Sequence, residues 1–440
     1  MKISTFTFPR GIHPHDHKRQ TDFKPTEKIL PAVGELMTCP MVQHLGAPCE
    51  PVVAAGESVL LGQKVGDSDK PMSAPVHASV SGVVKEIRTA LTPTGITCKA
   101  VVIENDGLDN PFTRTANAPT PSRKETLSLI REAGVVGLGG AGFPTHIKLN
   151  PPPGKIVKHV IVNGSECEPY LTTDHRAMLE DAERLISGLK IILTLFDDAT
   201  GIIAVENNKQ NAIDELARHI RNESSIQIAR VITKYPQGAE KQLIYALTKR
   251  EVPSGGLPAD VGCVVCNVDT VIAIERAVHR KRSLVRRIVT VAGGVVKNPG
   301  NYEVRLGMSY RSLVDRIGGF TQEPYKLVSG GPMMGVAMYT LDVPVTKTSS
   351  ALLCFTKAEA NFPPERDCIR CGRCVDHCPA RLMPLVLNQN VIYGEDEEFI
   401  KNHGLDCIEC GSCSFVCPSK RYLAQSIRAA RRTALAARKR

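Results

Sequence analysis

The chain has 440 residues, which is too many for one hydrophobic core and predicts about three domains. Its fifteen cysteines favour thiolate metal ligation over a disulfide framework if the compartment is reducing. The first residues lack an apolar leader, and no apolar run is long enough to span a membrane. We therefore expect a soluble, cytosolic protein of several modules.

The net charge of +10 is concentrated at one end of the chain. Residues 420–440 contain eight lysines and arginines and no acidic residue, whereas the rest is nearly neutral. Each such cation contributes about 1 kcal/mol near an anionic membrane surface, so this tail could hold the chain there. A solvated helix with spare charge is an equally good interpretation. Few aromatic residues accompany the charge, so nucleic acid is not an expected partner.

The first 120 residues contain short apolar runs separated by turn-forming residues, as at 50–67 and 73–87. This spacing predicts a small all-β unit. The two runs resemble the barrel-sandwich hybrid of biotinyl and lipoyl domains, so we expect that fold for residues 1–120. Lys70 occupies a place similar to that of a lipoylated lysine, but Pro71 follows it, and a plain surface lysine is the better prediction.

The middle of the chain alternates between strand-like and helical patterns. A helix is predicted from Ser122, its N-cap, to Gly134, its stop. The alternation that follows predicts an α/β layer with a parallel sheet over 121–284. Residues 285–345 then show strand, turn, strand, helix and strand, and the segment resembles a β-grasp module of the soluble-ligand-binding (SLBB) type. The strand-like runs lie at 158–164, 201–207, 226–235 and 263–270, and the helical ones at 175–193, 208–221 and 238–250.

Gly137, Gly139 and Gly142 have the spacing G-x-G-x-x-G. That spacing is typical of Rossmann dinucleotide-binding folds, in which a strand precedes the glycines and a helix follows them. Here the predicted helix precedes the glycines, and Phe143 and Pro144 follow. The context therefore argues against a Rossmann loop and for another phosphate-binding loop.

Two cysteine runs share the spacing C-x2-C-x2-C-x3-C-P. Three thiolates of such a run reach one [4Fe-4S] cluster, and the fourth serves the other cluster. Zinc ribbons are the alternative, but they favour two separated C-x2-C pairs. The 28 residues between the runs are partly helical in pattern, which predicts a helical ferredoxin domain. The predicted ligands are Cys368, Cys371, Cys374 and Cys417 for one cluster, and Cys407, Cys410, Cys413 and Cys378 for the other.

Cys263 and Cys266 form a lone C-x2-C pair in an alternating, strand-like stretch. No second pair accompanies them, so core cysteines are a better prediction than metal ligands.

Several further motifs occur in a fixed order along residues 6–420. Together with both cysteine runs, they resemble the C subunit of the Rnf ion-translocating NAD–ferredoxin oxidoreductase. The glycine loop also resembles the flavin loop of the NADH-oxidising subunit of respiratory complex I, although that subunit carries one cluster and has a glutamate where Ala239 stands here. The motifs are GIHPHDHK, GLGGAGFPTHIKL, NGSECEPYLTTDHRAM, VENNKQNAI, YPQGAEKQLI, CNVDT, VAGGVVKNPGNYEV and SGGPMMG.

The resemblance implies two [4Fe-4S] clusters, non-covalent FMN, and NAD(H) as substrate. It assigns Phe143 to the nicotinamide or adenine face, Lys148 to the FMN phosphate, and Glu166 and Glu168 to an acidic pair beside the flavin and the NADH ribose. The remaining cofactor-binding residues that it implies are Gly137, Gly139, Gly140, Gly142, Asn163, Tyr235, Gly238, Glu240 and Asn267.

The implied function is electron exchange between NAD(H) and ferredoxin, coupled to Na+ or H+ translocation. A hydride would pass between NADH and flavin, and single electrons would then pass through the clusters. The chain would be a peripheral subunit on the cytoplasmic side of the inner membrane, with the A, B, D, E and G subunits as partners and ferredoxin as an indirect one. A soluble NADH-dependent reductase of another acceptor, such as a corrinoid, and a non-catalytic electron relay are the alternatives. The expected final modules are a ferredoxin domain at 346–423 and a basic tail at 424–440.

Overall fold

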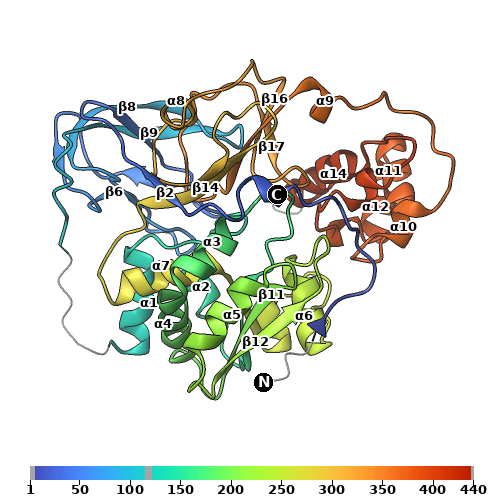
Figure 1. The fold of residues 1–440 in the computed structure, drawn as a ribbon. Coiled ribbons are helices and arrows are strands. Elements are labelled where there is room, and N and C mark those ends of the chain that lie inside the picture. The colour runs from blue at the N-terminus through green and yellow to red at the C-terminus, as the bar shows by residue number, and fades with distance from the viewer. Residues whose placement is uncertain (1–4, 114–120, 438–440) are drawn as a thin grey trace.

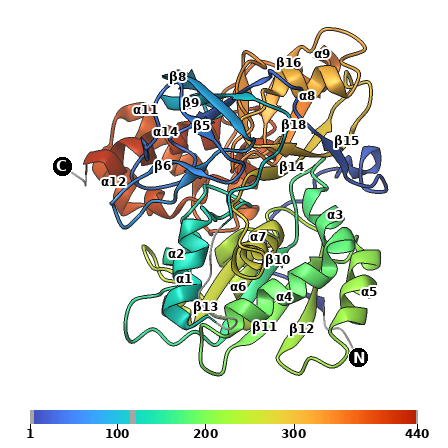
Figure 2. The ribbon, with the colours of Figure 1, turned by 90° about the vertical axis from the view of Figure 1, so that its left-hand side faces the viewer.

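The computed structural model describes residues 5–113 and 121–437. Four modules are visible in Figure 1: a β module and a second, mixed sheet lie above an α/β layer, and a helical module lies to the right. The turned view in Figure 2 shows the same layers, with helices α4 and α7 side by side. The predicted multi-domain class is confirmed: a β module, an α/β module, a β-grasp module and a helical module follow one another.

The N-terminal β module consists of two small sheets of mainly antiparallel strands. Its longest hairpin joins β8 and β9, and Ala100, Val101, Val102 and Ile103 in β9 are fully buried. The first sheet has the order β3-β9-β8-β5 and the second β4-β6-β7. The strands are β3 (Leu36–Pro40), β4 (Glu50–Pro51), β5 (Ser58–Val59), β6 (Lys64–Asp67), β7 (Val76–His77), β8 (Gly82–Leu91) and β9 (Thr97–Asn105).

The α/β module has a parallel sheet in the order β1-β12-β11-β10-β13. Helices α3, α4, α5 and α7 share one core with a face of this sheet, and α6 packs on the other face. The strands are β1 (Thr5–Phe6), β10 (His159–Gly164), β11 (Thr200–Glu206), β12 (Ile226–Val231) and β13 (Cys263–Asn267). The helices are α1 (Arg123–Glu132), α2 (Thr145–Lys148), α3 (Thr173–Glu180), α4 (Ala182–Leu193), α5 (Gln210–His219), α6 (Glu240–Thr248) and α7 (Val268–Val278).

Capping side chains decide two element boundaries in this module. Ser122 caps α1, and its hydroxyl and the carboxylate of Glu125 form a capping box. The predicted strand 263–270 ends at Asn267, because the Asn267 side chain accepts the backbone N–H of Asp269 and starts α7 there. Cys263 and Cys266 are buried in β13, as expected of core residues.

The β-grasp module is a six-stranded sheet in the order β17-β16-β18-β14-β15-β2. Two of its strands come from outside the expected range 285–345. β18 is buried throughout and lies between β14 and β16. Its buried backbone N–H and C=O groups therefore find their hydrogen-bond partners on both neighbouring strands. The elements are β2 (Glu27–Ile29), β14 (Arg286–Ala292), β15 (Gly300–Arg305), α8 (Tyr310–Arg316), β16 (Lys326–Ser329), β17 (Val336–Met338) and β18 (Ala351–Phe355).

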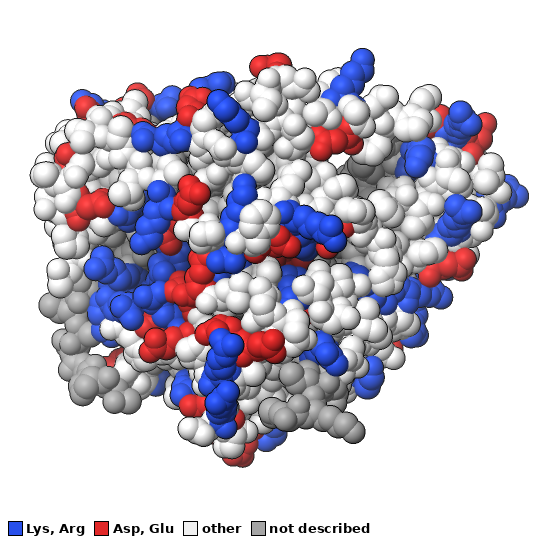
Figure 3. Space-filling model, in the orientation of Figure 1, with Lys and Arg blue, Asp and Glu red and all other residues white. Residues whose placement is uncertain are grey.

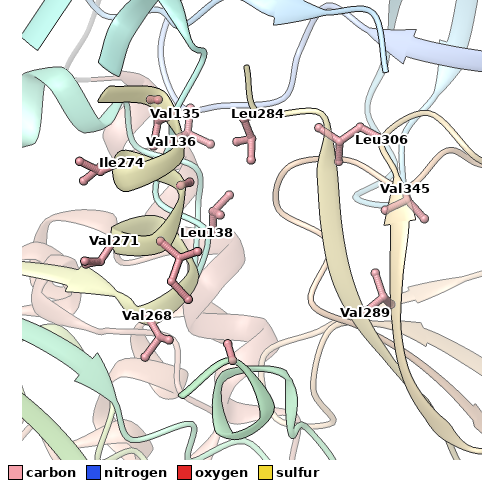
Figure 4. Packing of buried hydrophobic residues seen from close by; sticks show 14 of the residues in the cluster. Val135, Val136, Leu138, Val268, Val271, Ile274, Leu284, Val289, Leu306 and Val345 are labelled. Atoms are coloured by element: carbon pink, nitrogen blue, oxygen red, sulfur yellow. The ribbon is translucent and has the colours of Figure 1, made fainter. Parts of the chain in front are cut away.

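The first three modules share one hydrophobic core. Figure 4 shows Leu138 from the glycine loop, the preceding Val136 and Val271 from α7 on one side of this core, with Val289 from β14 and Val345 on the other. Because burial of apolar side chains is the main stabilising term in folding, this continuous core fixes the glycine loop relative to the β-grasp sheet.

The C-terminal module is helical, and it includes the segment expected to be a separate tail. Helix α14 packs against α11 and buries Leu423 and Ile427. Arg428 and Arg431 on α14 form ion pairs with Glu409 at 2.9 and 3.0 Å. The helices are α9 (Lys357–Ala360), α10 (Arg373–Asp376), α11 (Pro384–Tyr393), α12 (Asp396–Lys401), α13 (Ser412–Phe415) and α14 (Leu423–Ala437).

The expected boundary at residue 424 therefore falls inside a packed helix. Among residues 5–113 and 121–437, no helix has the length and apolar character needed to cross a bilayer.

Candidate functional site

The glycine loop follows helix α1 and is held by contacts at Leu138. The Leu138 N–H donates to the Thr270 hydroxyl at 2.9 Å, and its carbonyl accepts from Arg287 at 2.6 Å. Arg287 is itself paired with Asp269 at 2.7 Å. Pro144 precedes the short helix α2, so no long helix begins directly at the glycines. The loop is thus a rigid turn between α1 and α2, and its geometry is not that of a Rossmann loop.

Two glycines in the loop lie where a larger residue would meet other parts of the protein. Gly139 is exposed, but a Cβ there would lie 2.9 Å from the Cβ of Asn267. Gly142 has a φ of 71°, and its carbonyl accepts the N–H of Leu45 from the barrel module. Gly140 is exposed and has no described neighbour within 4 Å of a Cβ position. The loop therefore has free space for a ligand beside Gly140, whereas Asn267 fills the space beside Gly139.

Two asparagines mark the carboxyl ends of neighbouring strands. Asn163 in β10 and Asn267 in β13 are directly opposite each other in the parallel register. The Asn163 amide donates to the carbonyl of Gly238 at 2.8 Å. Because ligands of parallel α/β sheets bind outside the carboxyl ends of the strands, this edge, with the glycine loop beside Asn267, is the candidate cofactor site.

Lys148 lies at the same edge and is paired. Its ammonium group donates to Glu240 at 2.9 Å and to the carbonyl of Val265 at 3.0 Å. Burial alone lowers the pKa of Lys148, but Glu240 outweighs it and holds that pKa above its usual range. Lys148 is therefore charged, and an incoming phosphate would compete with Glu240 for it. Phe143 is half-buried, and its carbonyl accepts the N–H of Gly137 at 2.9 Å.

The two glutamates expected to form an acidic pair have different partners. The Glu166 carboxylate accepts the N–H groups of Asp174 at 2.6 Å and His175 at 3.3 Å, so it caps the first turn of α3. The Glu168 carboxylate accepts the N–H groups of Met333 at 3.1 Å and Met334 at 2.9 Å in the β-grasp module. Each glutamate therefore holds a different piece of backbone.

Burial is the largest influence on Glu168 and raises its pKa to about 7, against the two N–H donors that lower it. Burial and the neighbouring Glu166 likewise raise the pKa of Asp174 to about 7. The Asp174 carboxylate accepts the Asn267 amide at 2.7 Å. Both carboxyl groups can therefore change protonation state near neutral pH.

Sequence reasoning missed two residues of this edge. Lys18 is buried and donates to the carbonyls of Glu166, Glu168 and Leu171, which fixes the turn that carries both glutamates. Asp174 contacts Asn267, as described above. Both lie within motifs that were recognised, HPHDHK and TTDHRAM, but their partners are remote in sequence and only the fold brings them together.

The residues at the sheet edge fit a polar ligand such as FMN. The buried Gln237 side-chain amide and the Ser165 hydroxyl find no hydrogen-bond partner among the described residues. Gln237 adjoins Gly238, and Ser165 lies two residues after Asn163. Unpaired buried polar groups are costly, so a bound polar molecule at this edge would relieve them.

Tyr235 connects this edge to the helical module. The residue is 1% exposed, and its hydroxyl donates to the carbonyl of Cys410 at 2.7 Å. Tyr235, Cys410 and Ile12 form a small hydrophobic cluster that Cys167 and Met333 extend.

Four cysteines line one cavity in the helical module. Cys378 comes from the first run, and Cys407, Cys410 and Cys413 come from the second. Burial raises the pKa of the Cys413 thiol, and the other three cysteines raise it further because they are close. Backbone N–H groups of Leu382 and Glu409 lie 3.4 Å from the sulfurs of Cys378 and Cys407.

N–H donors aimed at sulfur are what cluster thiolates require, so these residues fit a [4Fe-4S] group. Within the described residues, no group of three His, Cys, Asp or Glu side chains is arranged to hold a single metal ion.

The other four cysteines lie nearer the surface. Cys374 from the first run is close enough to Cys417 from the second for the latter to raise its pKa, although burial is the larger cause. Cys368 and Cys371 are exposed in the segment that precedes α10.

The fold and the two sites define a class of flavin- and iron–sulfur-dependent NAD oxidoreductase subunits. Four family models match successive parts of the chain: the RnfC barrel sandwich hybrid domain at 6–108, the Nuo51 FMN-binding domain at 130–276, the SLBB domain at 288–337 and a 4Fe-4S dicluster domain at 367–422. The cofactors of this class are FMN and two [4Fe-4S] clusters.

Curated relatives cover nearly the whole chain. The chain is 46% identical to the C subunit of the proton-translocating ferredoxin:NAD(+) oxidoreductase complex of Clostridium ljungdahlii, over 89% of this chain and 86% of the relative. It is 44% identical to the C subunit of the Na(+)-translocating ferredoxin:NAD(+) oxidoreductase complex of Acetobacterium woodii, over 100% of this chain and 99% of the relative. The chain belongs to this family, the C subunits of Rnf-type ion-translocating oxidoreductase complexes.

A solved structure shares the fold. A chain of an NAD+-reducing [NiFe]-hydrogenase in the H2-reduced state aligns with a TM-score of 0.51 at 20% identity, and the alignment covers 72% of this chain and 63% of that one. At this identity the likeness concerns the fold alone.

Proposed function

We propose that this chain exchanges electrons between NAD(H) and the membrane part of a ferredoxin:NAD+ oxidoreductase complex that translocates ions. The observation that carries this proposal is the Tyr235 to Cys410 hydrogen bond, which joins the candidate flavin edge to the four-cysteine cavity. When bound, FMN supplies the conversion between a two-electron hydride and single electrons.

The chain's own residues bind and position the reactants. The backbone amides of 137–142 would hold a phosphate or ring, with Gly140 on the open face. Asn163 and Asn267 would donate to the flavin, and Lys148 would exchange Glu240 for the FMN phosphate. Phe143 would cover the nicotinamide. No general acid is needed for hydride transfer, so the chain would accelerate it by holding the nicotinamide and the flavin in the reacting orientation.

Glu166 and Glu168 act mainly through the backbone they hold. Glu166 fixes the start of α3 and so positions Asp174 against Asn267. Glu168 ties the turn after Asn163 to the β-grasp loop at Met333. Tyr235, Gly238 and Glu240 form the segment that covers the flavin.

The clusters have an order along the electron path. Cys378, Cys407, Cys410 and Cys413 would hold the cluster nearer to the flavin, because Cys410 contacts Tyr235. The second cluster, at Cys368, Cys371, Cys374 and Cys417, would be the outlet, because two of its four ligands are exposed and can face a partner subunit.

The chain would lie on the cytoplasmic side of the membrane, where NADH and ferredoxin are available. The A, B, D, E and G subunits would be its partners. One relative is named for protons and the other for Na+, and the coupling ion would be set in the membrane subunits.

Anaerobic isolation of the chain from its native membranes tests this proposal. We expect about eight iron atoms and one non-covalent FMN per chain, together with co-purifying membrane subunits. A soluble, flavin-containing chain without those subunits would favour a reductase of another acceptor, such as a corrinoid. Clusters without flavin would favour an electron relay, and a colourless or zinc-loaded chain would contradict all three.

A further inference from the structure

A cavity of about 700 Å³ lies where the first three modules meet. Its walls come from the C-terminal end of α7, from strands β2, β14 and β15, and from the barrel segment around Phe112. Figure 3 shows lysine and arginine side chains gathered on the left-hand side of that view, beside α7 and β14. The volume is in the range of small-molecule sites, about 300 to 1,000 Å³.

This cavity is separate from the candidate flavin edge. Asn267 and the glycine loop adjoin the first turn of α7, whereas the cavity contacts its last turns and the residues that follow. Helix α7 has 11 residues, so its two ends are about 16 Å apart at 1.5 Å per residue. None of the residues assigned to FMN or NAD(H) lines the cavity.

The cavity walls carry an excess of positive charge. Among the described residues, eight lysines and arginines line it, against two carboxylates, Asp109 and Glu303. Three further carboxylates lie behind the walls and form ion pairs with these cations: Asp181, Asp269 and Glu275. When they are included, the cations still outnumber the carboxylates by three. Across the described ranges, Lys28 and Arg282 take part in no ion pair.

Arg286 on β14 is the best-defined of these cations. It is 9% exposed, and Asp269 and Glu303 each lie 3.2 Å from its guanidinium. Its Nη1 has no hydrogen-bond partner among the described residues, and the approach of Glu303 to Nε is too poorly aligned to be a hydrogen bond. A buried, charged donor without an acceptor is costly, and a ligand oxygen in the cavity would supply one.

A purely structural role explains part of this charge. Arg280, Lys281 and Arg282 follow the C-terminal end of α7, where cations balance the helix dipole. That explanation does not apply to Arg286, which comes from another module and also lines the cavity.

We propose that this cavity binds a phosphate ester attached to an apolar body. The guanidinium of Arg286 would bind the phosphate, because its planar donors match phosphate oxygens, and Lys28 and Arg282 would assist at the mouth. Ile29, Leu61 and Phe112 provide apolar surface for the remainder of the ligand. A nucleoside phosphate and the headgroup of an anionic phospholipid share this chemistry.

Two binding measurements on the FMN-loaded chain, saturated with NAD+ to fill the dinucleotide site, test the proposal. Calorimetric titration with ADP examines the nucleotide source. Flotation with vesicles of equal parts phosphatidylglycerol and phosphatidylcholine examines the lipid source. We expect one of these probes to bind, and Arg286→Gln and Arg282→Gln each to weaken its affinity by roughly tenfold.

Arg218→Gln is the matched control, because Arg218 is an exposed arginine on α5 outside the cavity. If Arg286→Gln does not fold, the proposal is tested with Arg282→Gln and Lys28→Gln instead. Both of these side chains are exposed and take part in no ion pair among the described residues. Failure of both probes to bind, binding that survives the cavity substitutions, or binding that displaces FMN or NAD+ would each overturn the proposal.

Discussion

The phenol of Tyr235 donates a hydrogen bond of 2.7 Å to the backbone carbonyl of Cys410, 175 residues away in sequence. Tyr235 belongs to the segment that crosses the carboxyl edge of the parallel sheet, and Cys410 lines the four-cysteine cavity. The bond therefore fixes the segment that contains Tyr235, beside the candidate flavin site, against the four-cysteine cavity.

Replacing Tyr235 with phenylalanine removes this bond and leaves the Cys410 carbonyl buried without its partner. We expect a loss of about 1 kcal/mol in unfolding free energy. FMN and iron contents should be unchanged, and reduction of the clusters by NADH should be slower in stopped-flow absorbance. Tyr339→Phe, at an exposed tyrosine, is the control. Unaltered cluster reduction in Tyr235→Phe would show that the bond does not define the electron path.

Serine substitutions distinguish the two clusters. Cys413→Ser and Cys374→Ser should each lower the iron content by about four atoms per chain, because each removes a ligand of a different cluster. In Cys374→Ser, NADH should still reduce the remaining cluster, since the proposed order places that cluster nearer to the flavin. In Cys413→Ser, NADH should reduce the flavin but little of the remaining iron.

Cys263→Ser serves as the control for the cysteine series, because Cys263 is a buried strand residue and should leave iron content intact. If NADH reduces the remaining cluster of Cys413→Ser as fast as in the unaltered chain, the proposed order of the two clusters along the electron path is wrong.

Alanine substitutions at two adjacent glycines distinguish an effect on protein stability from an effect on FMN binding. Gly139→Ala places a Cβ 2.9 Å from the Cβ of Asn267, so both stability and FMN content should fall. Gly140→Ala meets nothing in the described protein, so thermal stability of the flavin-free chain should be unchanged. We expect Gly140→Ala to weaken FMN binding in a fluorescence titration, because its Cβ would occupy cofactor space. Full FMN affinity in Gly140→Ala would place the flavin elsewhere.

Glu168 makes stability depend on pH. Its pKa is about 7 in the folded chain, above the usual value of 4.5, so the folded state binds the proton more tightly. Stability should therefore fall as pH rises through the interval from 4.5 to 7, by about 3 kcal/mol. Glu168→Gln should lose that part of the dependence.

The measurement for Glu168 is chemical unfolding at pH 5 and pH 8 for both chains. Asp174 has a raised pKa as well, so both chains should keep a common background, and the difference between them isolates Glu168. An equal pH dependence in the two chains would contradict a raised pKa at Glu168.

Much of this architecture could be predicted from local patterns. Ser122 and Gly134 bounded a helix, alternation located the parallel sheet, and Asn163 was placed at a strand end. These features depend on periodicity and capping, which neighbouring residues determine.

Contacts between remote segments could not be predicted. β2 joins a sheet whose other strands all lie within residues 286–355, and Glu168 has its partners in the β-grasp module. The charge of the C-terminal segment suggested a free tail, but the apolar spacing of Leu423 and Ile427 lets α14 pack against α11. Lys18 shows no local signal, because all its acceptors lie about 150 residues away.

The most direct test of the account is rapid mixing of the anaerobic, fully loaded chain with NADH while flavin and iron–sulfur absorbance are followed separately. We expect flavin to be reduced first, and electrons then to appear on the cluster held by Cys378, Cys407, Cys410 and Cys413 before the other. Clusters that dithionite reduces but NADH does not, in a chain containing FMN, would contradict it.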